Sequence, residues 1–224
     1  MKLLIIIPAY NEEGSILKTI NDITSNKVPA DILVVNDGSK DNTEKLLIEN
    51  HINHITLPVN LGLTGAVQTG LKYAYENGYD AAIQFDGDGQ HQARFISKML
   101  DTLSQGYDIV IGSRFVDKPK DNSLRMIGSR IISSLIKLTT HQTINDPTSG
   151  MRMLNRNMIY DYAYSMNRRP EPDTLVYQIH HGAKIKEVQV DMSERVTGTS
   201  LYHGLSSSFK YMFNVIISIL FLSY

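Results

Sequence analysis

The chain has no cysteine and no excess of charge of either sign, and both absences restrict what it can do. Without cysteine it can form no disulfide, thiolate nucleophile or cysteine–zinc site, which fits a cytosolic setting. With 22 basic and 23 acidic residues the formal net charge is -1, so the overall charge attracts neither nucleic acid nor an anionic membrane. Nucleic acid is therefore not an expected partner, and any electrostatic function must be local.

Long hydrophobic runs are also missing. The apolar run at residues 3–7 is too short for the core of a signal peptide and predicts a buried strand instead. Residues 211–222, YMFNVIISILFL, are almost wholly apolar, but they fall short of the roughly 20 residues that a membrane-spanning helix needs. On a helix, Ser207, Asn214 and Ser218 would form only a narrow polar stripe. We expect a C-terminal helix that attaches to a membrane surface, packs on a small membrane-protein partner or mediates self-association; a buried core helix is the alternative.

What is present is an alternating pattern of short apolar runs and helical stretches. The 224 residues, 42% hydrophobic and 20% charged, are typical of a folded globular chain with a substantial core. Strands that alternate with helices predict a parallel sheet with right-handed crossovers. The expected strands are 3–7, 32–35, 54–57, 81–85, 109–111 and 184–192. The expected helices are 15–26, 41–50, 63–77, 94–105, 124–138, 155–165, 174–182 and 205–222.

Five of the expected strands end in polar or glycine-rich sequence: PAYNEE, NDGSKDN, VNLGLTG, DGDGQH and GSRF. In parallel sheets ligands bind beyond the carboxyl ends of the strands, so we expect these ends to gather at one edge and to form a site.

The segment DGDGQH places Asp86 and Asp88 directly after an expected strand. Carboxylates with open coordination positions suit Mg²⁺ or Mn²⁺, which bind one or two carboxylates together with substrate phosphates. A calcium-binding EF-hand loop is excluded, because its sixth position here is His91 and its twelfth is Ser97. The alternative is an ordinary Asp-Gly turn.

Two further patterns allow both a functional and a structural interpretation. Gly62 and Gly65 precede a helix and could let backbone N–H groups approach a phosphate, although helix capping explains them equally well. A basic cluster over residues 114–137 would be either a solvated charged face or a site for an anionic headgroup. Its basic members are Arg114, Lys118, Lys120, Arg125, Arg130 and Lys137.

Taken together, seven segments resemble family 2 glycosyltransferases, specifically the dolichyl- and polyprenyl-phosphate branch. They fall in order along most of the chain: IPAYNEEGSI (7–16), VVNDGSKDNT (34–43), NLGLTGAVQTGLKYA (60–74), DGDGQH (86–91), GSRF (112–115), DPTSGMR (146–152) and ERVTGTS (194–200). The resemblance implies an α/β GT-A fold, a Rossmann-like, mostly parallel sheet with helices on both faces, plus C-terminal amphipathic, interfacial helices. Residues 1–204 would be the catalytic domain and residues 205–224 a membrane-associating helix.

The resemblance also implies roles for single residues. The nucleotide-sugar donor would be bound by Pro8, Ala9, Tyr10, Glu12, Asp37, Gly65, Asp86, Gly87, Asp88 and Arg195, the last closing over the diphosphate. Mg²⁺ or Mn²⁺ would be held by Asp86, Asp88 and Gln90, with His91 outside the metal shell. The acceptor phosphate would be bound by Arg114, Arg125 and Ser129, and catalysis would depend on Asp88 and Arg114. One departure is HQARF, where the family pattern has Asp-Pro after the histidine, which changes the start of the following helix.

The resulting hypothesis is an inverting, metal-dependent enzyme that transfers a sugar from UDP-glucose or UDP-N-acetylglucosamine to undecaprenyl phosphate. It would act in cell-envelope and cell-wall glycan assembly as a peripheral protein at the cytoplasmic face of the cell membrane. A lipid phosphate is already anionic and needs no strong general base, only cations that oppose charge repulsion. An alternative enzyme would extend a lipid-linked or cell-wall glycan at a sugar hydroxyl, with Asp146, Glu171 or Asp173 as the base. A non-catalytic nucleotide-binding subunit recruited to a membrane is the alternative from another class.

Overall fold

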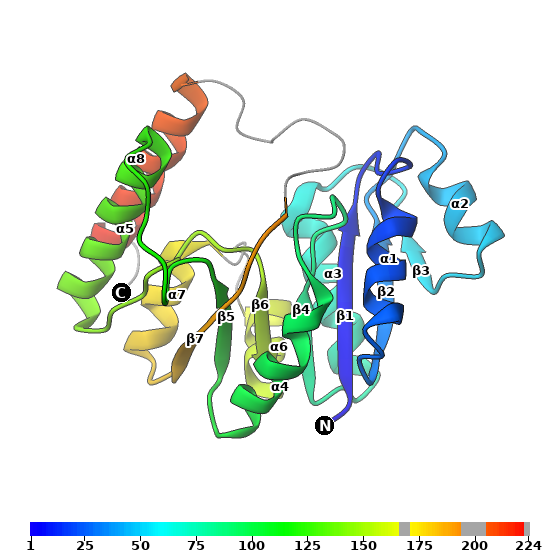
Figure 1. Cartoon of the computed structure of the whole chain (residues 1–224), viewed down its shortest axis with the longest axis horizontal. Helices are drawn as coiled ribbons and strands as arrows, with labels where there is room; N and C mark the ends of the chain where they lie inside the picture. Colours follow the sequence, from blue (N-terminus) through cyan, green and yellow to red (C-terminus); the bar gives the residue numbers. More distant parts are fainter. Residues whose placement is uncertain (166–170, 194–204, 222–224) are drawn as a thin grey trace.

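A seven-stranded sheet forms the centre of the molecule in the computed structural model (Figure 1). The structure describes residues 1–165, 171–193 and 205–221, apart from the side chains of residues 124–125, 205–211 and 221. The strands are β1 (Leu3–Ala9), β2 (Ala30–Asn36), β3 (His54–Thr56), β4 (Ala81–Gln84), β5 (Ile109–Ser113), β6 (Arg152–Asn155) and β7 (Ile185–Gln189). Their order across the sheet is β3-β2-β1-β4-β6-β5-β7.

One strand departs from the parallel pattern of the sheet. β6, for which the sequence analysis predicts no element, lies between β4 and β5 and runs antiparallel to both. It pairs Asn155 with Ala81 of β4 and Arg152 with Ile111 of β5. Only four residues long and polar at both ends, β6 has too little hydrophobic pattern to be recognised, and its pairing on both sides stabilises it. The sheet is therefore mostly parallel, as the resemblance implies.

Helices cover both faces of the sheet. They are α1 (Ile16–Ser25), α2 (Thr43–Glu49), α3 (Gly62–Glu76), η1 (Ala93–Phe95), α4 (Ile96–Ser104), α5 (Leu124–Thr140), α6 (Arg156–Tyr160), η2 (Asp161–Ser165), α7 (Pro172–His180) and α8 (Leu205–Phe221). Every expected helix is present, with its ends shifted by a few residues at most. In β1, Leu3, Ile5 and Ile7 pack with α1, α2 and α4, while Leu4 and Ile6 pack in the core that contains α3, α6 and α7. Because both faces are covered, the first strand is a continuous apolar run rather than an alternating one.

α5 and α8 lie side by side at one end of the molecule and pack against α7 (Figure 1). Val215 and Ile219 of α8 are buried, so one side of this helix is part of the core. Other apolar side chains of the pair are exposed: Ile127, Ile131 and Leu138 on α5, and Phe213, Ile217 and Leu220 on α8. Among the helices in the described part of the chain, none is long and apolar enough to cross a membrane.

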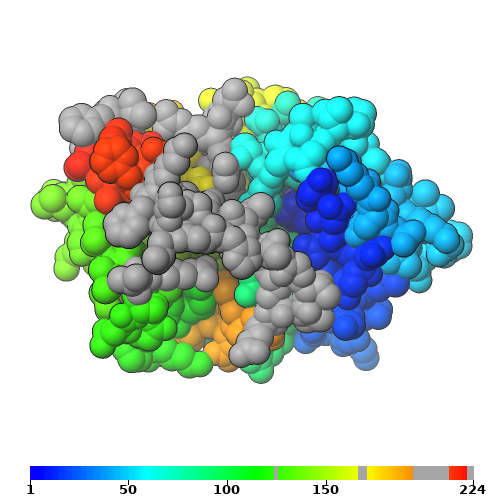
Figure 2. All heavy atoms as spheres, turned by 90° about the horizontal axis from the view of Figure 1, so that it is seen from above, coloured from blue at the N-terminus to red at the C-terminus, as the bar shows by residue number. Residues whose placement is uncertain are grey.

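The carboxyl ends of β1, β2, β4 and β5 point to the upper edge of the sheet in Figure 1. Figure 2 looks onto this edge from above, with the N-terminal segments (blue and cyan) on one side and α5 (green) and α8 (red) on the other. The edge therefore has the N-terminal α/β units on one side and the helical pair of α5 and α8 on the other.

Candidate functional site

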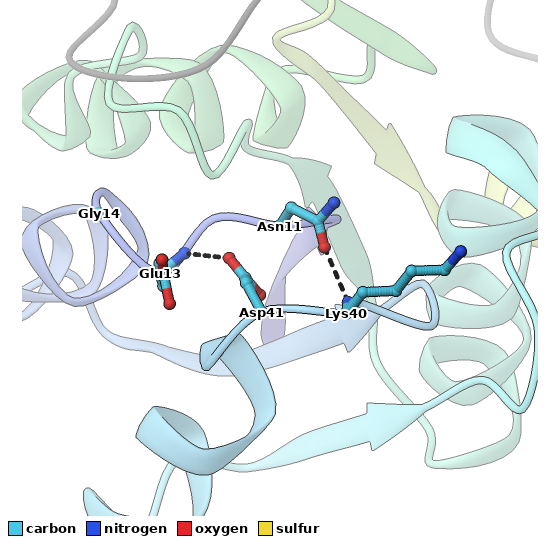
Figure 3. A pocket seen from close by; sticks show the side chains of 5 residues that line it. All are labelled: Asn11, Glu13, Gly14, Lys40 and Asp41. Atoms are coloured by element: carbon cyan, nitrogen blue, oxygen red, sulfur yellow. Dashed lines mark hydrogen bonds between the residues drawn. The ribbon is translucent and has the colours of Figure 1, made fainter.

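The loops that follow β1 and β2 are joined by hydrogen bonds at the edge of the sheet (Figure 3). The N–H of Lys40 donates to Asn11 Oδ1 at 2.8 Å, and the N–H of Glu13 donates to Asp41 Oδ2 at 3.1 Å. These residues and Gly14 line a surface hollow of about 490 Å³. None of the described residues assigned to the donor lines this hollow, although Tyr10 and Glu12 are next to its lining residues in the chain.

Asp37, one of the residues assigned to the donor, ties the ends of three elements together. Its N–H donates to Ala9 O at 2.8 Å, and its Oδ1 accepts the N–H of Leu61, at the start of α3, at 2.7 Å. Only 3% of Asp37 is exposed, and this burial raises the pKa of its carboxyl even though the N–H groups of Leu61 and Gly62 act to lower it. The next residue, Gly38, has φ +67°, and a Cβ there would lie 3.0 Å from the backbone that leads into α3.

The other N-terminal residues assigned to the donor lie around Asp37. Pro8 and Ala9 are the last two residues of β1, and Tyr10 beyond them is 42% exposed. The N–H of Glu12 donates to Thr43 Oγ1 at 2.9 Å, and its carboxylate accepts a short hydrogen bond from the Ser15 hydroxyl. These residues therefore sit at the carboxyl edge, as expected.

Gly65 has a packing role that the structure makes plain. A Cβ at this position would lie 2.4 Å from the Cβ of Leu61 in the preceding turn. The structural interpretation of this glycine therefore accounts for its presence in α3, whether or not a donor contacts it.

The segment DGDGQH follows β4 and is held by its own hydrogen bonds. Asp86 Oδ1 accepts from Gln84 Nε2 at 3.0 Å, and the N–H of Asp86 donates to His91 Nδ1 at 2.9 Å. The N–H of Gln90 donates to Asp88 Oδ1 at 3.0 Å, the geometry of an Asx turn. The Asp-Gly turn is thus present, and it fixes both carboxylates at the strand end.

His91 contacts Asp86 through both of its ring nitrogens. A backbone N–H can only donate, so Nδ1 carries no proton and Nε2 carries the proton of the neutral ring. Nε2 lies 3.5 Å from Asp86 Oδ2, and the ring stands edge-on to Phe85 with centroids 5.3 Å apart. His91 is 4% exposed and therefore positions Asp86 by its backbone and its carboxylate together.

The oxygen-bearing side chains of this turn fit the ligands of a hard divalent cation. The Asp86 side chain is 33% exposed, Asp88 is 4% exposed, and Gln90 is partly buried. Within residues 1–165, 171–193 and 205–221, no three His, Asp or Glu side chains form a group that could hold a metal without other ligands. Mg²⁺ and Mn²⁺ fit two carboxylates and an amide oxygen when substrate phosphates complete the shell.

The turn DPTSG, residues 146–150, joins this segment to the end of β5. At one end, a Cβ on Gly150 would lie 3.3 Å from both Asp86 Oδ2 and Gln84 Nε2. At the other end, fully buried Asp146 accepts from Arg114 Nε at 2.7 Å and from Arg114 Nη2 at 2.8 Å. Burial acts to lower the pKa of Arg114, but the hydrogen bonds and charge of Asp146 raise it overall. The side chains assigned to the metal and to the acceptor phosphate are thus one short turn apart.

Arg152 holds the same turn from inside the protein. This residue is 3% exposed, and its Nη2 donates to Pro147 O at 2.7 Å while its Nε donates to Ser149 O at 3.1 Å. Ser149 Oγ in turn donates to Gly112 O at 2.6 Å. Arg152 has no role that could be predicted from the sequence, because only the antiparallel β6 brings it to this turn.

On α5, Ser129 is buried beside Lys120, a member of the basic cluster for which no separate role is predicted. Lys120 Nζ donates to Ser129 Oγ at 2.8 Å and to Ser133 Oγ at 3.1 Å. The two serines therefore share a helix face, as their spacing of four residues predicts. The side chain of Arg125 lies outside the described part of the chain.

The segment that follows β7 also reaches the DGDGQH turn. The N–H of Ser193 donates to Gln90 O at 2.9 Å, and Gln92 Nε2 donates to Ser193 Oγ at 2.9 Å. Arg195, assigned to the diphosphate, lies outside the described residues. The chain therefore leaves the described structure next to DGDGQH, two residues before Arg195.

The departure HQARF from the family pattern has a local counterpart. The N–H of Ala93, the first residue of η1, donates to Asp22 Oδ2 at 2.8 Å. The carboxylate of Asp22 in α1 therefore caps the start of η1. In the family pattern, an aspartate directly after the histidine stands in this segment.

The chain is similar to glycosyltransferases both in a family model and in single relatives. The family model described as glycosyl transferase family 2 matches residues 4–163. A UDP-N-acetylglucosamine–dolichyl-phosphate N-acetylglucosaminyltransferase of Methanococcus voltae is 32% identical over 177 residues, 69% of this chain and 70% of that protein. An undecaprenyl-phosphate mannosyltransferase of Micrococcus luteus is 30% identical over 219 residues, 91% of this chain and 88% of that protein.

A solved structure shows the same fold. The structure of glucosyl-3-phosphoglycerate synthase from Mycobacterium tuberculosis, in complex with Mn²⁺, UDP-glucose and phosphoglyceric acid, aligns with a TM-score of 0.73. The alignment covers 97% of this chain and 79% of that chain at 18% identity. The expected GT-A fold, with its mostly parallel sheet between helices, is therefore confirmed.

Proposed function

The chain belongs to glycosyl transferase family 2, in the dolichyl- and polyprenyl-phosphate branch, and we propose that this glycosyltransferase moves a sugar from a nucleotide-sugar donor to a polyprenyl phosphate. The relatives named above supply the acceptor class, since their names specify dolichyl and undecaprenyl phosphate. The donor is UDP-glucose or UDP-N-acetylglucosamine, and the product enters cell-envelope glycan assembly. Inversion at the anomeric carbon follows from a single displacement.

The observation that carries the proposal is the DPTSG turn, which passes so close to Asp86 at Gly150 that a Cβ there would lie 3.3 Å from Asp86 Oδ2, and which bonds to Arg114 through Asp146. A donor bound by its diphosphate at Asp86 and an acceptor bound by its phosphate at Arg114 would meet across this turn. Holding the two reactants next to each other supplies a large part of the catalysis in such a transfer.

On the donor side, Asp86, Asp88 and Gln90 would hold Mg²⁺ or Mn²⁺. The cation, when bound, neutralises the charge that develops on the nucleoside diphosphate leaving group. Pro8, Ala9, Tyr10, Glu12, Asp37, Gly65, Gly87 and Arg195 are the other residues proposed to bind the nucleotide and its diphosphate.

On the acceptor side, a phosphate oxygen forms a bond to the sugar C1 while the bond from C1 to the diphosphate oxygen breaks. The electron pair of the broken bond leaves with the nucleoside diphosphate. No proton has to be removed from the acceptor, because its phosphate is already anionic at pH 7. Arg114, Arg125 and Ser129 are proposed to hold the acceptor phosphate, with electrostatic stabilisation as their main contribution.

Transfer to a sugar hydroxyl, the alternative reaction, needs a carboxylate that can take a proton. Asp146 is fully buried and bonded to Arg114 through both oxygens. Asp173 is 9% exposed and accepts from Ser218 Oγ at 2.5 Å and from the N–H of Thr174 at 3.0 Å. Two of the three candidate bases are thus engaged inside the protein, which favours the acceptor that needs no base.

The proposed acceptor is a membrane lipid, and the exposed apolar side chains of α5 and α8 would bring the enzyme to the membrane that holds it. Residues 1–204 would form the catalytic domain, and residues 205–224 would bind the membrane surface at its cytoplasmic face. The buried side of α8 keeps this surface attached to the catalytic domain through α5 and α7.

A donor screen tests the proposal. Purified protein, Mn²⁺ and undecaprenyl phosphate are incubated with UDP-sugars and GDP-sugars, and the released nucleotide and the glycolipid are quantified. We expect glycolipid with one donor class, and a loss of about 100-fold or more in Asp88→Asn, because even changes to residues that only hydrogen-bond to metal ligands cost about 10- to 100-fold. Asp101→Asn, at an exposed position of α4, serves as the matched control.

Two results would contradict the proposal. Sugar found only on a hydroxyl acceptor would establish the alternative enzyme. Nucleotide binding without turnover of any donor would establish the non-catalytic subunit.

A further inference from the structure

Lys120, in the loop between β5 and α5, has an ammonium group whose hydrogen-bond partners are neutral hydroxyls. Its Nζ donates to the hydroxyls of Ser129 and Ser133, at 2.8 and 3.1 Å. In the part of the chain that the structure describes, no carboxylate lies within ion-pair distance of this Nζ. The side chain is half-buried, and this burial lowers the pKa of Lys120. A cation in such surroundings is stabilised by any anion that reaches it.

The neighbouring basic side chains are engaged differently. The guanidinium of Arg114 is bonded through two nitrogens to Asp146, so its charge is largely balanced. Lys118 forms an ion pair with Asp191 at 2.6 Å. Lys120 therefore differs from both in having hydroxyl oxygens where they have carboxylates.

The charges around Lys120 do not cancel. Its electrostatic neighbours are the carboxylates Asp146 and Glu187 and the guanidinium groups of Arg114 and Arg130. Among the residues that the structure describes, these four and Lys120 make three positive and two negative charges, a local excess of one positive charge. Glu187 is already occupied, because its carboxylate accepts the N–H groups of residues 145 and 146, each at 2.7 Å. An alkyl phosphate, with about −1.5 to −2 charges at pH 7, has the sign needed to balance the excess.

The position of Lys120 is also fixed close to GSRF. Arg130 Nη2 donates to the backbone carbonyl of Lys120 at 2.7 Å, which holds the loop on α5. Lys120 Nζ and Arg114 Cζ lie 5.5 Å and 5.1 Å from the centroid of the Phe115 ring. Both cations therefore lie around one aromatic ring at the end of β5, on the acceptor side of the DPTSG turn.

We infer that Lys120 supplies a further positive charge to the acceptor phosphate, beside the arginines already proposed to bind it, with Ser129 as its hydroxyl partner. An ammonium group has three donors, of which two are used here, and a hydroxyl that accepts from it still has a proton to donate. A phosphate oxygen can therefore receive one N–H from Lys120 and one O–H from Ser129 at the same place. This inference rests on the proposed phosphate acceptor, and it assigns charge at that subsite to a residue outside the set implied by the family resemblance.

Steady-state kinetics with a short, water-soluble isoprenyl phosphate tests the inference without a membrane. Lys120→Met keeps the length of the side chain and removes its charge, Lys120→Arg keeps the charge, and Lys137→Met is the control at an exposed position of α5. We expect the KM for the isoprenyl phosphate to rise about 10- to 100-fold in Lys120→Met, the effect of losing a hydrogen bond between charged groups. The KM for the donor should stay within about twofold, a separation that a general structural defect would not produce. Lys120→Arg should recover most of the acceptor affinity.

Chemical labelling tests the site independently of turnover. The folded wild-type protein is acetylated with acetic anhydride, and the modification of each lysine is measured by mass spectrometry. Isoprenyl phosphate should slow the acetylation of Lys120 and leave Lys137 unaffected, whereas the corresponding isoprenol should slow neither. Inorganic phosphate is a third arm, which shows whether the phosphate alone or the whole lipid head is required.

The outcomes separate the two proposals. An unchanged acceptor KM in Lys120→Met, or acetylation of Lys120 that isoprenyl phosphate does not slow, would overturn the role of Lys120 while sugar transfer by the wild type still stands. Protection of Lys120 by isoprenyl phosphate in a protein that transfers no sugar to it would support the anion site and contradict the proposed function.

Discussion

The ion pair between Arg114 and Asp146 offers the most direct test of how the site is built. Asp146 is fully buried and the Arg114 side chain is 21% exposed, so the pair is closer to an interior than to a surface salt bridge. Breaking a buried pair by removing one partner costs about 3–5 kcal/mol, because the other charge stays buried without compensation. Arg114→Met leaves Asp146 with the N–H of residue 114 at 3.1 Å and the Thr148 hydroxyl at 3.3 Å.

We expect Arg114→Met to lower the free energy of unfolding by about 3 kcal/mol, at the lower end of that range because Arg114 is partly hydrated. In a chain of this size that corresponds to a decrease in Tm of roughly 6–12 °C. Asp146→Asn should cost less, since the guanidinium it leaves behind reaches water. The double variant should be more stable than the sum of the single changes predicts, by about 1 kcal/mol or more, because it buries no unpaired charge.

Urea denaturation of the wild type, both single variants and the double variant measures this coupling. Lys118→Met and Asp191→Asn form the comparison cycle, at an ion pair whose side chains are 63% and 41% exposed. That pair should show little coupling, and less still at high salt. If the effects at Arg114 and Asp146 add to within about 0.5 kcal/mol, the pair is not a coupled unit and the account of the DPTSG turn is wrong.

Two further predictions concern the donor side and the exposed apolar side chains of α5 and α8. Burial raises the pKa of Asp37 above its ordinary value of 3.8, so the stability that this residue contributes should fall as pH rises from 3.8 through the raised pKa. In Asp37→Asn the amide oxygen can still accept the Leu61 N–H. This variant should therefore be at least as stable as the wild type at pH 7 in urea denaturation. A larger gain in the free energy of unfolding at pH 4 than at pH 7 would refute this. Replacing Ile131 and Phe213, 40% and 63% exposed, by serine should weaken cosedimentation with phosphatidylglycerol vesicles by roughly 10-fold or more. The same replacement at Ile48 of α2, 57% exposed, should have no effect, and equal losses at both places would argue against a lipid-facing surface on α5 and α8.

Much of the architecture could be predicted from the sequence because it depends on neighbouring residues. The run at residues 3–7 and the polar segments that follow the first, second, fourth and fifth strands indicated a parallel sheet with one functional edge. The structure has these strands, with DGDGQH at the end of β4 and GSRF at the end of β5. Helical periodicity also indicated that Ser129 and Ser133 share a face, which Lys120 contacts in the structure.

The internal connections of the site depend on contacts between distant segments. The sequence by itself determined the order of strands and helices, the carboxylates at a strand end and the family motifs, since these follow from local periodicity and from residues adjacent in the chain. Only the tertiary structure decided that β6 lies antiparallel between β4 and β5, that Asp146 engages Arg114, and that Lys120 has hydroxyl groups rather than a carboxylate at its ammonium. The physical reason is that a charge finds its partner by proximity in the folded chain, and proximity across 32 residues between Arg114 and Asp146 is set by how the sheet is assembled.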